Sequence, residues 1–168
     1  TDDAIAWYEN NGASDPSWTA VDIATSADGA RSVYVGDIDS DGDLDIVSGS
    51  YEDDAIAWYE NGLAAYGYPG FNAADIATSA DGAASVFVAD MDNDGDMDIV
   101  SASIDDDAIA WYENNGASDP SFTAADIATS ADGAASVFVA DMDNDGDMDI
   151  VSASYYDDAI AWYESDGA

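Results

Sequence analysis

Three acidic loops carry the residue types best suited to chemistry in this chain of 168 residues. Each loop has nine residues, reading DIDSDGDLD at 37–45 and DMDNDGDMD at both 90–98 and 141–149. Carboxylates stand at positions 1, 3, 5, 7 and 9 around one glycine at position 6. Five like charges in nine residues repel one another strongly unless a cation lies among them. Oxygen ligands on a flexible loop suit Ca²⁺, which takes about 6–8 oxygens, better than Mg²⁺, which keeps several waters in a strict octahedron.

The spacing also distinguishes these loops from an EF-hand, which needs a bidentate acid at position 12 and a helix on each side. Position 12 is a serine in every loop (Ser48, Ser101 and Ser152), and a short β-like run follows. We therefore expect the acid at position 9 to close the ligand shell, and position 7 to bind through its main-chain carbonyl. The glycine at position 6 should adopt the positive φ of a sharp turn. An acidic, solvated turn without metal is the alternative.

The prediction is thus three calcium ions per chain, one in each loop. The predicted ligands are the aspartates at the odd positions of the three loops. They are Asp37, Asp39, Asp41, Asp43 and Asp45 in the first loop, Asp90, Asp92, Asp94, Asp96 and Asp98 in the second, and Asp141, Asp143, Asp145, Asp147 and Asp149 in the third.

Composition and charge exclude several function classes. The formal net charge is −37, with Arg31 as the one basic residue and neither His nor Cys. We exclude nucleic acid and anionic membranes as partners because both need a basic patch, and no apolar run approaches the roughly 18 residues of a membrane helix. Three Ca²⁺ ions contribute +6, so salt must screen most of the remaining charge. We therefore expect a saline, calcium-rich, extracellular location, and a polypeptide cut from something longer.

The elements that hold these loops repeat about every 50 residues. The loops start 53 and then 51 residues apart, and the string DDAIAWYE occurs four times, at 2–9, 53–60, 106–113 and 157–164. Residues 74–103 are identical to residues 125–154. This identity indicates a recent duplication or deliberate construction. Periods near 50 residues are typical of propellers and solenoids.

Each repeat contains four strand signals, at 85–89, 98–103, 108–113 and 122–129 in the copy that starts after Gly82. Four antiparallel strands per repeat predict an all-β fold of propeller blades. We divide the single array of 1–168 into a partial blade at 1–30 (third and fourth strands), blades at 31–80 and 81–131, and a partial blade at 132–168 (first to third strands). This division gives thirteen strands, one more than three blades need.

Three blades do not close a propeller, because closed rings have about 4–8 blades. We therefore expect a homo-oligomer, most simply a dimer of about six blades, in which the split blades are completed across the interface. One copy of the third strand in each chain would then be surplus or displaced.

The motif DxDxDGDxDIV, followed by a strand of the WYEN type, resembles the FG-GAP/VCBS repeat. This repeat is the calcium-binding blade of integrin α-subunit propellers and of several lectins and polysaccharide-active proteins. The resemblance covers the whole chain, although no intact Phe-Gly…Gly-Ala-Pro motif is present, so the match is to the VCBS-like branch. It implies calcium between the first two strands of each blade, and ligands bound on the opposite face.

On that opposite face we expect the loops between the second and third strands to be the candidate ligand surface. Clustered acids beside tyrosines could bind further cations or hydrogen-bond sugar hydroxyls, or they could be solvated turns that supply charge. The candidates are Tyr51, Glu52, Asp53, Asp54, Asp105, Asp106, Asp107, Tyr155, Tyr156, Asp157 and Asp158.

Two further features have alternative interpretations. The tryptophans of the WYE strings (Trp7, Trp58, Trp111 and Trp162) could stack on sugars, but a strand position with period-2 burial favours the core between blades. The loop 63–70 is two residues longer than its counterparts. It marks either a specific contact or drift in an exposed loop, and we favour drift.

An enzyme would have to find its chemistry without His, Cys or Lys. The acids are also spread evenly over all repeats, whereas catalysis needs one asymmetric constellation, so we expect no catalysis. The preferred function is a calcium-stabilised propeller module for structure, adhesion or ligand binding. A lectin-like, carbohydrate-binding propeller and an engineered or fragmentary repeat protein without a ligand are the alternatives.

Overall fold

The computed structural model describes residues 3–63 and 69–167. In this part of the chain every regular element is a β-strand, and the turns that join the strands are short. The strands are β1 (Ile5–Asn10), β2 (Trp18–Ala24), β3 (Ala30–Gly36), β4 (Asp45–Ser50), β5 (Ala55–Leu63), β6 (Pro69–Ala77), β7 (Ala83–Ala89), β8 (Asp98–Ser103), β9 (Ala108–Asn114), β10 (Phe122–Ala128), β11 (Ala134–Ala140), β12 (Asp149–Ser154) and β13 (Ala159–Tyr163).

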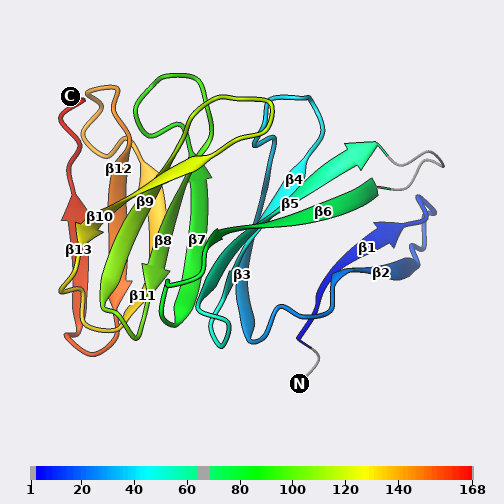
Figure 1. Cartoon of the computed structure of the whole chain (residues 1–168), viewed down its shortest axis with the longest axis horizontal. Coiled ribbons are helices and arrows are strands. Elements are labelled where there is room, and N and C mark those ends of the chain that lie inside the picture. Colours follow the sequence, from blue (N-terminus) through cyan, green and yellow to red (C-terminus); the bar gives the residue numbers. More distant parts are fainter. Residues whose placement is uncertain (1–2, 64–68, 168) are drawn as a thin grey trace.

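The strands form four antiparallel sheets that follow one another in chain order (Figure 1). Two of these sheets have four strands, β3-β4-β5-β6 and β7-β8-β9-β10. Before them lies the two-stranded sheet β1-β2, and after them the three-stranded sheet β11-β12-β13. The predicted all-β class with four-stranded antiparallel sheets is confirmed. The described residues do not close into a ring (Figure 1).

The strand sequences explain why the sheets stack. Successive side chains of a strand point to opposite faces, so a strand between two sheets needs apolar residues on both faces. In β5, Ile56 and Trp58 pack in the core shared with β7, whereas Ala57 and Tyr59 pack in the core shared with Ile5 of β1. The WYE strand therefore joins one sheet to both of its neighbours.

The predicted core role of the tryptophans holds where sheets lie on both sides. Trp58 is buried between the two four-stranded sheets. The half-buried Trp111 packs against the core shared with the sheet β11-β12-β13. Trp7 is half-buried, and Trp162 in β13 is exposed. The position of the tryptophan in the WYE string thus determines the face of the sheet on which the indole lies. The presence of a neighbouring sheet on that face determines how far the indole is buried.

Serines of β3 and β7, the first strands of the two four-stranded sheets, accept hydrogen bonds from the next sheet along the chain. The Val86 N–H donates to Ser32 Oγ, and the Val137 N–H donates to Ser85 Oγ. Aromatic rings on the same strands form a row, with centroid separations of 5.1 Å between Tyr34 and Phe87 and 4.9 Å between Phe87 and Phe138. These contacts fix the spacing of the sheets and hence of the acidic loops that they carry.

The described part of the chain contains no helix, and therefore no helical segment long and apolar enough to cross a membrane. The longer loop at 63–70 joins β5 to β6, and the tip at 64–68 lies outside the described residues.

Candidate metal centres

Each acidic loop joins the first strand of its sheet to the second: β3 to β4, β7 to β8 and β11 to β12. Because neighbouring sheets run in the same sense, all three loops lie along one edge of the stack, the upper edge in Figure 1. Asn93 Nδ2 of the second loop donates to Asp147 Oδ1 of the third over 3.0 Å. The loops therefore form a connected row and not three isolated turns.

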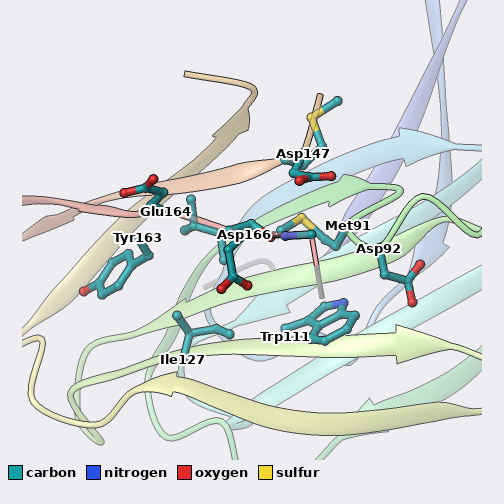
Figure 2. A pocket seen from close by; sticks show the side chains of 12 residues that line it. Met91, Asp92, Trp111, Ile127, Asp147, Tyr163, Glu164 and Asp166 are labelled. Carbon is teal, nitrogen blue, oxygen red and sulfur yellow. Dashed lines mark hydrogen bonds between the residues drawn. The ribbon is translucent and has the colours of Figure 1, made fainter. Parts of the chain in front are cut away.

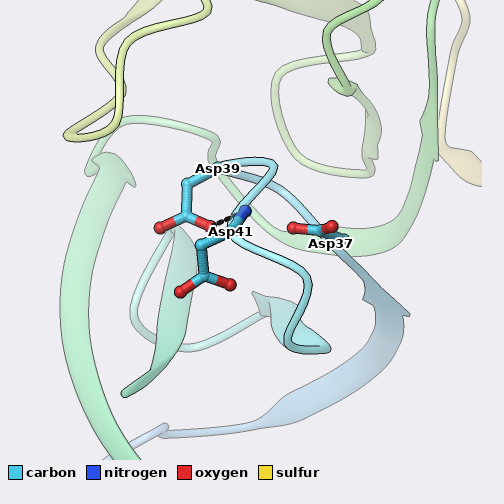
Figure 3. A group of neighbouring side chains, drawn as sticks. All are labelled: Asp37, Asp39 and Asp41. Carbon is cyan, nitrogen blue, oxygen red and sulfur yellow. Dashed lines mark hydrogen bonds between the residues drawn. The ribbon is translucent and has the colours of Figure 1, made fainter. Parts of the chain in front are cut away.

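The carboxylates at positions 1, 3 and 5 converge in every loop. One oxygen from each lies within 4.8 Å of the others in the sets Asp37, Asp39 and Asp41; Asp90, Asp92 and Asp94; and Asp141, Asp143 and Asp145. Figure 3 shows the first of these sets, with its three carboxylates held around one turn of the loop. The structure thus brings nine of the fifteen predicted ligands together, three for each loop.

Backbone N–H groups of the same loop fix each carboxylate of these sets. In the second loop the Gly95 N–H donates to Asp90 Oδ2 over 3.1 Å, the Asp94 N–H to Asp92 Oδ1 over 3.2 Å, and the Asp96 N–H to Asp94 Oδ1 over 2.9 Å. The other loops repeat this pattern. The loop is therefore preorganised, with the carboxylates held by their own backbone.

Buried oxygens without a protein partner show that a cation fits this arrangement. Oδ1 of Asp37 and Oδ1 of Asp90 are buried and accept no hydrogen bond. A buried carboxylate oxygen without a partner is costly. In the third loop the Asn144 N–H donates to the corresponding oxygen of Asp141. All donors are hard oxygens, which fits Ca²⁺ and does not fit metals that prefer nitrogen or sulfur.

The turn itself needs two residues with positive φ. The glycines at position 6 have φ of 96°, 98° and 103°, as expected for Gly42, Gly95 and Gly146. Position 4 also has positive φ, 60° at Ser40 and 62° at Asn93. Asn is one of the few residues that adopts this conformation readily, so the Asn of the DNDG sequence in the second and third loops suits the backbone at position 4.

The aspartate at position 9 is held differently from the other four. Asp45, Asp98 and Asp149 are each 1% exposed and start the second strand of their sheets. Oδ2 of Asp98 accepts from the Met91 N–H over 3.0 Å, and Oδ1 accepts from the Asn114 N–H over 2.8 Å. The position-9 carboxylates do not belong to the sets of three. Each oxygen keeps a second lone pair, so their predicted role as ligands stays a prediction.

The position-7 carboxylates of the second and third loops contact groups outside their own loop. The carboxylates of Asp96 and Asp147 fill the space beside Gly116 and Gly167, where an added Cβ would collide with them. This packing is consistent with the expectation that position 7 offers its carbonyl to the metal and leaves its carboxylate free. Asp43 of the first loop has its N–H bonded to Asp41 Oδ1.

Burial shifts the pKa values of the loop acids. Burial raises the pKa of Asp98 from 3.8 to about 6, against the hydrogen bonds from Asn114 and Met91, which lower it. The pKa of the equivalent Asp149 is instead lowered, mainly by the hydrogen bond from the Ser165 N–H. The two pKa values move in opposite directions because burial is the larger effect at Asp98 and the Ser165 hydrogen bond is the larger effect at Asp149. Burial also raises the pKa of Asp39, and the charges of its neighbours raise it further.

These loops and the strands around them identify the repeat. The sequence profile described as FG-GAP-like repeat matches the chain three times, over residues 1–48, 39–101 and 90–152. Together the three matches extend over nearly the whole chain. The chain belongs to the FG-GAP-like repeat family. No curated protein matched the chain closely enough to count as a relative.

A residue of the FG-GAP-like repeat that the sequence analysis did not single out fixes the position-9 aspartate. This is the Asn that ends WYEN. Asn114 is 2% exposed, and its Nδ2 donates to the carbonyls of Met97 and Ile38, each over 3.0 Å. Ile38 belongs to the acidic loop of the preceding sheet, so Asn114 joins two loops. The signal in the sequence was its recurrence as Asn10, Asn61 and Asn114, with Ser165 in the last copy.

Replacing Asn114 by Ser, the residue of the last copy, is expected to destabilise the protein by about 1–3 kcal/mol, because the buried Ile38 carbonyl and the partly buried Met97 carbonyl lose their donor. Asn93→Ser is the matched control. Its side chain is exposed and the first loop already carries Ser40 at that position, so we expect a change within about 0.5 kcal/mol. Urea unfolding in calcium measures both. Equal losses in the two variants would contradict the proposed role of Asn114.

The candidate ligand loops of the FG-GAP-like repeats lie at the opposite edge, between β4 and β5, β8 and β9, and β12 and β13. The structure gives several of their acids a structural task. Asp54 Oδ1 and Asp107 Oδ1 accept from the N–H groups of Gly82 and Gly133, which begin the next sheet. Asp53 Oδ2 likewise accepts from the Asp28 N–H. Asp54 and Asp107 thus hold one sheet to the next, and Asp53 holds the turn that leads into its own sheet, whatever else they bind.

The tyrosines of these loops differ in their surroundings. Tyr51 lies under the guanidinium of Arg31, with 3.7 Å between Arg31 Cζ and the ring centroid. A hydrogen bond to Asp105 raises the pKa of Tyr51. Tyr155 and Tyr156 are exposed and contact each other edge to face, with centroids 5.1 Å apart. Asp157 and Asp158 complete that last turn and are exposed.

Proposed function

We propose that this chain is a calcium-stabilised β-propeller module with a structural or ligand-binding role and no catalytic one. The observation that carries the proposal is the convergence of three carboxylates in each loop, with a buried, unpartnered Oδ1 at Asp37 and Asp90. A Ca²⁺ ion would be held by positions 1, 3 and 5, by the carbonyl of position 7 and by the carboxylate of position 9. The ion supplies positive charge that lets the loop acids approach one another.

Because the ions neutralise only part of the charge, we further propose an extracellular, saline location. At 1 M salt the Debye length falls to about 3 Å, which screens the remaining acids from one another. Such a setting also supplies the calcium.

Calorimetric titration of the chelator-treated chain tests the proposal. We expect three Ca²⁺ ions to bind per chain and Mg²⁺ to bind more weakly, because Mg²⁺ gives up its waters reluctantly. An excess of Mg²⁺ in the same buffer is the control. A titration in which Ca²⁺ produces no heat and no change in the fluorescence of the tryptophans would refute the proposal.

Carbohydrate binding is the more specific form of the ligand-binding role. It is supported by the exposed pair Tyr155 and Tyr156, because exposed aromatic rings beside hydrogen-bonding acids suit sugars. A glycan array probed with and without calcium distinguishes a lectin-like propeller from a module without a sugar ligand.

We also propose that the chain self-associates into a dimer of about six blades. The support is the presence of incomplete sheets at both ends of the stack, β1-β2 and β11-β12-β13. Six blades fall within the range of about 4–8 that closes a propeller.

A further inference from the structure

Identical residues have different exposure in the inner and outer sheets of the stack. Val86 and Val88 of β7 are buried against the preceding sheet, whereas Val33 and Val35, at the same positions of β3, are 56% and 54% exposed. The β1-β2 hairpin covers only the outer half of the sheet that contains β3, through the core around Ile5. Within the described residues, no first and second strands of a preceding blade pack against β3 and β4.

The last sheet shows the opposite defect. Its strands β11, β12 and β13 correspond to the first three strands of a blade, and no strand pairs with the outer edge of β13 within the described residues. The face that would meet a following sheet is exposed at Phe138, Ile160 and Trp162, although Ile109, the equivalent of Ile160, is fully buried. This sheet lacks its fourth strand.

The β1-β2 hairpin presents an aromatic face that matches this gap. Tyr8 is 59% exposed, whereas Tyr59 and Tyr112, at the same position of the WYE string, are 5% exposed. Trp18, at the start of β2, is 60% exposed. By strand register Trp18 opposes Asn10 as Phe122 opposes Asn114. Phe122 packs against the core between the two four-stranded sheets.

At the site where the last sheet lacks the equivalent of Phe122, the structure has a cavity of about 280 Å³. Its apolar lining comes from Met91, Trp111 and Ile127 on one side and from Ile150 and Tyr163 of the last sheet on the other. The lining also includes the acids Asp92, Asp147, Glu164 and Asp166. Figure 2 shows Asp166 of the C-terminal segment over this cavity, facing Trp111 and Ile127. An aspartate is a poor occupant beside the apolar part of this lining, where a tryptophan would bury apolar surface.

The acidic loop of the last sheet is also the one without its Asn. Ser165 takes the place of Asn114, and its N–H donates to Asp149 as that of Asn114 does to Asp98. Serine has no amide to reach the carbonyls that Asn114 Nδ2 bonds in the second loop. Asn10 of β1 does have one, and it follows the same string DDAIAWYE that β13 carries at 157–164.

We infer that the β1-β2 hairpin of one copy completes the last sheet of a second copy, with β1 replacing β13 beside β12. Residues Asp2–Glu9 and Asp157–Glu164 are identical, so the exchange keeps every side chain of the third strand. It adds a fourth strand, places Trp18 in the cavity and brings Asn10 to the third acidic loop. This inference rests on the proposed dimer and names its interface and the surplus strand.

The same contact covers the other exposed surface. When β1 and β2 join the partner's β11 and β12, these two strands lie in front of β3 and bury Val33 and Val35. The serine contact then has its counterpart in the partner's Ser136 and the Val33 N–H, matching the bonds from Val86 to Ser32 and from Val137 to Ser85. Two such composite sheets and two pairs of four-stranded sheets give a ring of six.

Light scattering of the 168-residue chain in calcium and 0.5 M NaCl tests the interface. We expect a species of twice the 17.4 kDa chain mass. Trp7→Ala and Trp162→Ala change the same residue of the same string, and are therefore matched. Trp7→Ala should weaken the dimer about thirtyfold or more, the loss typical of an interface hot spot. Trp162→Ala should leave its affinity unchanged or raise it, because β13 is the displaced strand.

Trp18→Ala is a second test that remains valid if Trp7→Ala fails to fold. Because Trp18 is exposed in the single chain, its loss should weaken the dimer and leave the fold of the chain unchanged. The calcium dependence of the thermal transition, measured on the same variants, reports the metal sites separately. A monomer, or an open polymer of broad mass, overturns the inference. A dimer that Trp162→Ala weakens and Trp7→Ala does not would keep the assembly but overturn the exchange of β13.

Discussion

Removing calcium with a chelator at low ionic strength is expected to lower the thermal midpoint of this protein by about 15–30 °C. A ligand present at 100 times its Kd stabilises a folded chain by about 2.7 kcal/mol for each site. Three loops then contribute about 8 kcal/mol, and each kcal/mol moves the midpoint of a chain of this size by about 2–4 °C. Since whole domains are stable by only about 5–15 kcal/mol, the metal-free chain should be marginally stable at 25 °C. Circular dichroism measures the midpoint.

Sodium chloride provides the control for the chelator experiment. At 1 M salt the metal-free chain should recover part of the loss, because screening weakens the repulsion among the 38 Asp and Glu residues. It should not recover the part that comes from specific coordination. A midpoint that does not move with the chelator at low salt would mean that the metal has no structural role.

The repeat pattern allowed most of the fold to be predicted. The strand signals at 85–89 and 98–103 correspond to β7 and β8, and thirteen strands occur in the described part of the chain. Short apolar runs bounded by acidic turns and repeated about every 50 residues are compatible with few folds other than a series of antiparallel sheets. The blade boundaries rest on the same pattern. The exposure of the outer sheets could not be predicted, because it depends on which sheet lies beside each copy and not on local sequence.

The metal loops could be predicted in part. The spacing of carboxylates correctly brought positions 1, 3 and 5 together, and Gly95 has the expected positive φ. The contact of Asn114 with Ile38 was not foreseen, because it joins residues 76 positions apart in different sheets. Local spacing contains no information about such a contact. The hydrogen bond from the Asn114 N–H to Asp98 was missed for a related reason, because Asn114 ends a different strand from the one that Asp98 begins.

The acids of the opposite edge illustrate a further limit. Their clustering suggested a ligand surface, yet Asp54 and Asp107 hold the first turn of the next sheet. A repeat array needs polar contacts between successive units, and these contacts have the same composition as a binding loop. The exposed Tyr155 and Tyr156, with Asp157 and Asp158 beside them, keep the character that the sequence suggested.

Asp98→Asn is expected to weaken calcium binding at the second loop by more than the roughly 10- to 100-fold typical of residues that only orient a ligand. The substitution removes a carboxylate that we propose as a calcium ligand. Asp98 accepts hydrogen bonds from the N–H groups of Met91 and Asn114, and the new side-chain amide would place its own N–H against one of these donors. Asp96→Asn removes the same charge two residues away, where we expect the carbonyl to bind, and should change the affinity less than about threefold. Calorimetry with the other two loops as internal references measures both.

The pH dependence gives this comparison a second readout. Burial raises the pKa of Asp98 to about 6 in the metal-free chain, so the folded state binds a proton more tightly than the unfolded state, where the pKa is 3.8. In chelator, this group should therefore add stability as the pH falls from 7 through 6 towards 4, by up to about 3 kcal/mol. In calcium the sign reverses, because the proton competes with the ion for the carboxylate. Asp98→Asn should abolish both effects and Asp96→Asn should keep both. Equal pH profiles in the two variants would mean that position 9 neither titrates with folding nor binds the metal, and that the loop coordinates calcium through positions 1, 3, 5 and 7 alone.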